Sequence, residues 1–96
     1  MAITVDDKRE QVRLLKSVVL STLGLLGGYG AIKALLTKAM ANELILNESG
    51  QRLLSVCEPI RFGATEDPSV SIQMVRDIEE LLREEIDRWN RVLNLG

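Results

Sequence analysis

The stretch STLGLLGGYGAIKALL, residues 21–36, decides the fold because it places four of the chain's seven glycines inside its most apolar region. Two structures are compatible with it. The run Gly27-Gly28-Tyr29-Gly30 is typical of a loop between two helices, since each glycine inside a helix in water costs about 1 kcal/mol relative to alanine. The same glycines are compatible with one continuous helix in a bilayer, where they let a second helix approach closely.

The length of the apolar region favours the continuous helix. From Ser17 to Leu36 the only charged residue is Lys33, and a helix of this length measures about 30 Å, the thickness of a bilayer's hydrocarbon core. Small residues then recur at spacings of four, three, four and three along one face: Ser17, Ser21, Gly24, Gly28 and Ala31. We expect a single membrane span over 17–36 whose small-residue face packs on another helix, with Gly24 and Gly28 as a GxxxG pair. A helical hairpin that turns at Gly27–Gly30 stays open as the alternative.

Size and charge limit the classes of protein. A chain of 96 residues is one small domain at most, and its net charge of −2 comes without a Lys/Arg cluster beyond Lys8-Arg9. Nucleic acid is therefore not an expected partner. The N-terminal 16 residues are too long and too acidic for a cleaved secretory signal. The single cysteine, Cys57, excludes an internal disulfide and is expected to be a small buried hydrophobe.

The chain divides into three parts, all of them helical or irregular. Residues 1–40 hold a helix that Thr4 caps and that is expected as far as about Leu26, followed by the rest of the glycine-rich segment. The predicted apolar face of this helix consists of Val12, Leu15, Val19, Leu23 and Leu26. Residues 41–67 contain turn and loop signals such as Asn47-Glu48-Ser49-Gly50, and are expected to form short helices and loop, with a small hairpin around Gly50 left open. Residues 68–94 begin after Asp67 with a proline, a favourable helix start. The predicted fold class is all-α.

The last of these segments is the clearest amphipathic helix. Its apolar residues step by three or four, and they form the expected partner-binding face: Ile72, Val75, Ile78, Leu82, Ile86, Trp89 and Leu93. The charged run EELLREEIDR, residues 79–88, is expected to be the solvated side. The sequence does not decide whether the partner is the chain itself, a second copy or another protein.

The sequence has few of the residues that usually carry out catalysis. The chain has no histidine and one cysteine, and the glycines lack both the Gly-Lys-Ser/Thr run of a phosphate loop and the spacing of a dinucleotide fold. We expect no catalytic residue, no cofactor, no metal and no small-molecule substrate. The sequence indicates a protein that is not an enzyme.

Two segments resemble subunit e of the mitochondrial F-type ATP synthase, a small accessory membrane subunit: KSVVLSTLGLLGGYGAIKALL, residues 16–36, and EDPSVSIQMVRDIEELL, residues 66–82. The resemblance implies a non-catalytic subunit of the inner mitochondrial membrane that pairs with a neighbouring subunit through GxxxG and helps to hold synthase dimers. It implies that Gly24 and Gly28 are helix-packing residues, that Gly27 assists the close approach, and that Lys33 is an interfacial charge. The N-terminal stretch before Lys16 is longer than is usual in that family.

Two functional hypotheses follow. In the first, a membrane subunit contacts lipid, packs through its small-residue face into a larger complex, and binds a protein partner through its last helix. In the second, a water-soluble, cytoplasmic helical adaptor or assembly protein oligomerises through apolar helix faces. Under the first hypothesis, Gly28→Leu weakens association with the partner without preventing membrane insertion.

Overall fold

The computed structural model describes residues 5–23, 25, 27–62 and 68–95, and these form four α-helices and one 3-10 helix. Helix α1 spans Val5–Thr22, α2 Gly28–Ala41, α3 Asn47–Cys57 and α4 Pro68–Leu95, with the 3-10 helix η1 at Glu58–Phe62. No strand occurs in the described ranges. The all-α fold class is confirmed.

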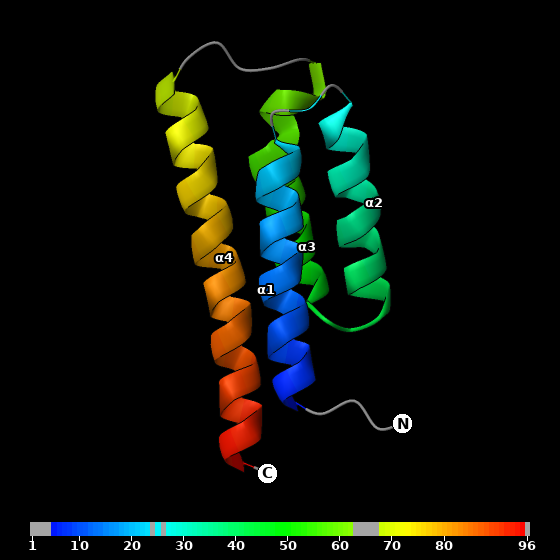
Figure 1. The fold of residues 1–96 in the computed structure, drawn as a ribbon, viewed down its shortest axis with the longest axis vertical. Helices are drawn as coiled ribbons and strands as arrows, with labels where there is room; N and C mark the ends of the chain where they lie inside the picture. Colours follow the sequence, from blue (N-terminus) through cyan, green and yellow to red (C-terminus); the bar gives the residue numbers. More distant parts are fainter. Residues whose placement is uncertain (1–4, 24, 26, 63–67, 96) are drawn as a thin grey trace.

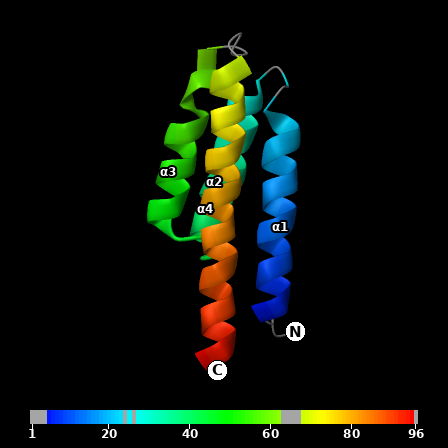
Figure 2. The same ribbon diagram turned by 90° about the vertical axis from the view of Figure 1, so that its left-hand side faces the viewer.

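The helices form an elongated four-helix bundle of 45 × 24 × 20 Å. Each helix runs antiparallel to the next, so that both termini lie at the same end of the molecule (Figure 1). Helix α1 packs on α4 and α2, and α3 packs on α2 and α4, which makes a closed ring of neighbours (Figure 2). Among the four interfaces between α-helices, that of α1 with α4 is the most extensive and that of α1 with α2 is the least extensive.

The continuous helix predicted over 17–36 is wrong, because the chain turns between Thr22 and Gly28. Gly27 has φ 74°, in the left-handed region that glycine enters without a side-chain clash. The backbone N–H of Leu25 donates to the carbonyl oxygen of Thr22 at 3.1 Å, and that of Gly28 donates to the carbonyl oxygen of Leu25 at 2.9 Å. The glycine-rich run is thus a connection between antiparallel helices, the alternative that the sequence left open.

Gly28 is the first residue of α2, and its lack of a side chain lets the end of α1 lie close to it. A Cβ atom there would collide with the backbone carbonyl oxygen of Thr22, whereas a Cβ at Gly30 would meet nothing within 4 Å. The backbone at the end of α1 therefore lies against the start of α2. Gly28 is therefore required by the close approach of two consecutive helices of the same chain. The predicted approach of a second helix in a bilayer is not what places a glycine here.

The absence of one long apolar helix has a direct consequence for the predicted span. Helices α1 and α2 have 18 and 14 residues, or about 27 and 21 Å at 1.5 Å per residue, less than the roughly 30 Å of hydrocarbon. Over the residues that the structure describes, none of the helices combines the length and the apolarity that crossing a bilayer requires.

The core lies along the axis of the bundle. Every helix from α1 to α4 contributes to it, with these buried hydrophobic residues: Val12, Leu15, Val19, Ile32, Leu36, Ala39, Leu44, Ile45, Leu53, Cys57, Met74, Ile78 and Leu82. Val12, Leu15 and Val19 belong to the face predicted for the first helix. Leu23, on the same predicted face, is partly buried in the connection, and Leu26 and the predicted cap Thr4 lie outside the described residues.

The middle of the chain is more regular than its turn signals suggest. Asn47-Glu48-Ser49-Gly50 forms the first turn of α3, so the turn predicted there is wrong, and so is the hairpin left open around Gly50. Gly50 is buried, and a Cβ on it would collide with the side chain of Met40 in α2. This glycine therefore permits close packing of α2 on α3.

Candidate functional site

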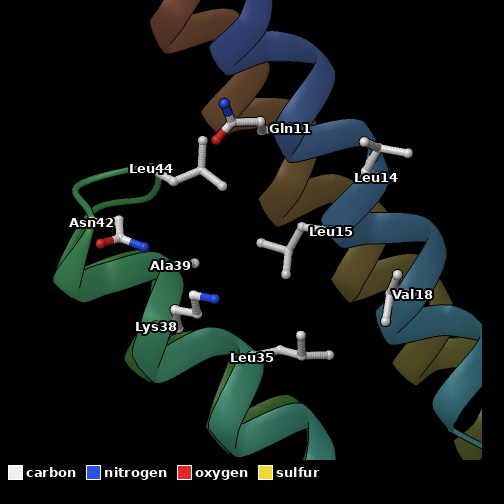
Figure 3. Close-up of a pocket in the computed structure, with 9 residues that line it drawn as sticks. All are labelled: Gln11, Leu14, Leu15, Val18, Leu35, Lys38, Ala39, Asn42 and Leu44. Atoms are coloured by element: carbon white, nitrogen blue, oxygen red, sulfur yellow. The ribbon is translucent and has the colours of Figure 1, made fainter. Parts of the chain in front are cut away.

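An apolar groove of about 280 Å³ lies between α1 and α2 (Figure 3). The groove thus belongs to the least extensive of the four interfaces between α-helices. We name it the α1–α2 groove. The residues that line it are Gln11, Leu14, Leu15 and Val18 from α1, Leu35, Lys38 and Ala39 from α2, and Asn42 and Leu44 from the following connection.

The floor of the groove is aliphatic. Leu15 and Leu35 point from opposite helices into the space between them, and Leu44 reaches toward α1 at the end near Gln11 (Figure 3). On the α1 wall, Leu14 is 57% exposed and Val18 is 45% exposed. Large aliphatic side chains that stay this exposed beside a concave apolar surface are typical of a protein interaction site.

Other small or aliphatic residues nearby in the sequence are exposed as well. Ser21 follows Val18 by three residues on α1, and Leu25, in the connection after α1, is 64% exposed. In α2, Ala31 and Ala34 are exposed as well. Helices α1 and α2 and their connection thus expose several aliphatic and small residues besides those that line the groove.

The half of the chain that forms α1 and α2 carries a small excess of positive charge. Residues 5–44 include six Lys or Arg and four acidic residues, whereas residues 47–96 include six Lys or Arg and ten acidic residues. Helix α2 has no acidic residue, and its cations are Lys33 and Lys38. The amine of Lys38 points across the groove toward α1 (Figure 3), and no hydrogen bond or ion pair involves it within the described part of the chain.

A buried carboxylate on α4 fixes the end of the groove. Glu85 is 1% exposed, and its Oε1 accepts a hydrogen bond of 3.0 Å from the backbone N–H of Leu46. Leu46 is the residue that caps α3 and has no side-chain hydrogen bond of its own. An anion at this position compensates the unpaired N–H groups and the positive end of the α3 dipole.

Arg88 and Trp89 hold the same connection. Arg88 Nε donates to Glu85 Oε2 at 2.7 Å, while Trp89 Nε1 and Arg88 Nη2 donate to the carbonyl oxygen of Leu44 at 3.0 and 3.3 Å. The Arg88 guanidinium also lies 4.6 Å from the centre of the Trp89 ring. These three residues, the Glu85 cluster, position Leu44, whose side chain closes one end of the α1–α2 groove.

The sequence prediction missed this cluster. Residues 79–88 were expected to be a solvated face, and Glu85 is a correction to that prediction because it is buried. It lies three residues after Leu82 and four before Trp89, so its spacing places it on the apolar face. That spacing was the available signal, although the partner that makes its burial favourable, the N–H of Leu46, is 39 residues away.

The predicted helix-packing face does not exist as one surface. Ser17 and Ser21 are exposed on α1, Gly28 is buried at the start of α2, Ala31 is exposed on α2, and Gly24 lies outside the described residues. Because the chain turns between them, their regular spacing does not place them on one helix. The predicted GxxxG contact through Gly24 and Gly28 loses its geometric basis.

The predicted partner-binding face of α4 is mainly occupied by the chain itself. Ile78 and Leu82 are fully buried in the core, and Ile86 and Trp89 pack against it. Val75 is half-buried, Ile72 is 55% exposed, and the side chain of Leu93 lies outside the described part of the structure. The partner of this helix is therefore the chain's own bundle, and the buried face is centred on Met74, Ile78, Leu82 and Glu85.

Reactive groups do not converge in the described regions. Cys57 is fully buried, as predicted, and burial raises the pKa of its thiol from 9.0 to about 11, which keeps it protonated and weakly nucleophilic. Among the residues that the structure places, no group of three acidic or cysteine side chains is arranged to hold a metal ion. What the groove can offer is a surface for apolar side chains, with a cation beside it.

Comparison of the chain with models of protein families, with curated proteins and with solved structures gives no match.

Proposed function

We propose that this chain is a non-catalytic helical adaptor or assembly protein, and that it associates with another protein through the α1–α2 groove. One observation carries the proposal: Leu14 and Val18 remain about half exposed beside an aliphatic groove, while the other side of α1 is buried along α4. Leu14 and Val18 do not belong to the buried core of the bundle.

The energetics of the surface fit a binding role. Full burial of a Leu or Val side chain contributes about 1.5 to 3 kcal/mol, so covering the exposed halves of Leu14 and Val18 contributes about 1 kcal/mol each. Filling the groove itself adds further apolar contact. These gains support a modest and reversible association, which suits an adaptor.

The membrane-subunit hypothesis has less support. It depended on one helix across residues 17–36, and the chain instead turns between Thr22 and Gly28. The resemblance to subunit e of ATP synthase, with the inner mitochondrial membrane as its location, stays a prediction that the comparisons do not address. The adaptor hypothesis needs only surfaces that the bundle presents.

The experiment compares three forms of the tagged full chain in extracts of the cells that express it naturally. We expect Leu14→Glu combined with Val18→Glu to lose the proteins that co-purify with the wild type, because charges in an apolar contact are costly to desolvate. Ile72→Glu is the matched control, since Ile72 is equally exposed but lies on α4.

Circular dichroism and thermal unfolding of each variant show whether it folds as the wild type does. Loss of the same proteins from the folded groove variant alone supports the proposal. Identical co-purification with all three forms contradicts it, and loss from the Ile72→Glu variant alone moves the interaction surface to α4.

A further inference from the structure

We infer that the segment that occupies the α1–α2 groove is an amphipathic helix of another protein, with acidic residues beside its apolar face. This inference rests on the proposed function and specifies the chemistry of the partner. It follows from the shape of the groove, from the charges around it, and from what a second copy of the chain can present.

The shape of the groove fits side chains from a helix. Two antiparallel helices form its walls, and its volume of about 280 Å³ accommodates a few aliphatic side chains but not a helix backbone. Helices that dock in this way insert residues spaced at i, i+3 or i+4, and i+7, while their backbone lies above the groove. Leu14 and Val18, themselves four residues apart on α1, provide the complementary ridge.

The charge in the groove indicates which charge the partner helix carries beside its apolar face. Lys38 lines the groove, on a helix that has no acidic residue. Helix α1 carries Asp6 and Asp7 in its first turn, its Glu10 is paired with Arg13 at 3.4 Å, and Glu43 adjoins the end of the groove beyond Asn42. Beside Lys38, the one cation among the described residues that line the groove, an acidic flank gains an attraction and a basic flank meets repulsion.

A second copy of the chain fits the groove less well. In a two-fold dimer the same surface meets itself, which brings the Lys38 side chains of both copies into one interface. Helix α4 is acidic and amphipathic, but Ile78 and Leu82 on its apolar face are already buried in its own bundle. The apolar face of this acidic helix is therefore not free to bind a copy of the chain.

Two synthetic peptides test the inference directly. Both are helical, about 18 residues long, with Leu at the anchor positions; one has Glu on its flanks and the other has Lys. In fluorescence anisotropy at low salt, we expect the Glu peptide to bind the full chain about fivefold more tightly. Higher salt should reduce this preference, because it screens exposed charges.

The variants separate the role of charge from that of apolar contact. Lys38→Glu should reverse the order of the two peptides, whereas Lys33→Glu, a change of the same charge outside the groove, should preserve it. If both peptides bind equally and the Leu14→Glu, Val18→Glu variant binds neither, the acidic partner is wrong and the adaptor function stands. Absence of binding by either peptide also overturns the inference.

Two other occupants are outcomes of parallel measurements. Light scattering across a range of concentrations that shows a dimer, lost on changing Leu14 and Val18 to Glu, would assign the groove to a second copy. Sedimentation with phosphatidylserine vesicles that depends on the same two residues would assign it to an anionic membrane surface. Either result overturns the inference, and a monomer that does not sediment agrees with it.

Discussion

The two sides of helix α1 differ in how completely their apolar residues are buried. Along α4 it forms the most extensive interface of the bundle, where Arg9 donates a hydrogen bond to Asn90 and the amine of Lys8 lies 5.8 Å from the centre of the Trp89 ring. Along α2 it leaves a groove with Leu14 and Val18 half exposed. The difference indicates that α1 buries most of its apolar surface along α4 and leaves Leu14 and Val18 exposed along α2.

The largest expected effect lies in the buried core, at a residue of α4. Leu82→Ala should lower the free energy of unfolding by about 2 to 5 kcal/mol, because it removes a fully buried side chain and leaves a cavity. Leu14→Ala, at the groove, should change it by no more than about 0.5 kcal/mol. Urea denaturation measures both, and equal losses would remove the distinction between the two interfaces.

The next effect concerns the carboxylate that fixes the end of the groove. Glu85→Ala should cost about 1 to 3 kcal/mol, since the N–H of Leu46 and the Arg88 guanidinium lose their acceptor. Glu85→Gln should cost less, because an amide oxygen can still accept from Leu46. Glu84→Ala, an exposed neighbour, is the control in the same denaturation series. If the Glu85→Ala variant were as stable as this control, the Glu85 cluster would not stabilise the connection between α2 and α3.

The smallest effects distinguish a turn from a continuous helix. Gly28→Ala should destabilise by about 1 kcal/mol or more, since its Cβ collides with the carbonyl oxygen of Thr22. Gly30→Ala, which has open space and lies inside α2, should stabilise by about 0.5 to 1 kcal/mol. Thermal unfolding gives the two signs. Stabilisation by both substitutions would indicate a continuous helix.

The sequence predicts the regular parts of this fold well. Val12, Leu15 and Val19 recur at helical spacing and are buried, and α4 begins at Pro68 where a favourable start was expected. These features are local, because an apolar face and a proline at the first turn act within one helix.

The glycine-rich segment could not be decided in this way. Residues spaced by three and four share a face only if the helix continues, and the same glycines also permit the left-handed turn at Gly27. The outcome depends on whether α1 and α2 have partners to pack on, and α3 and α4, which supply them, lie far along the chain. Glu85 was missed for the same reason, because its partner belongs to a distant connection. The groove itself arises from the packing of two helices and has no sequence motif.

The antiparallel arrangement of α1 and α2 is the central claim, and the distance between their far ends tests it most directly. Spin labels at Glu10 and Ala41, both exposed, can be introduced as cysteines in a Cys57→Ala background and measured by pulsed electron resonance. Because the neighbouring Gln11 and Asn42 line the same groove, we expect a separation well below 30 Å. One continuous helix would separate the two positions by about 46 Å at 1.5 Å per residue, and that result would contradict the bundle and the groove together.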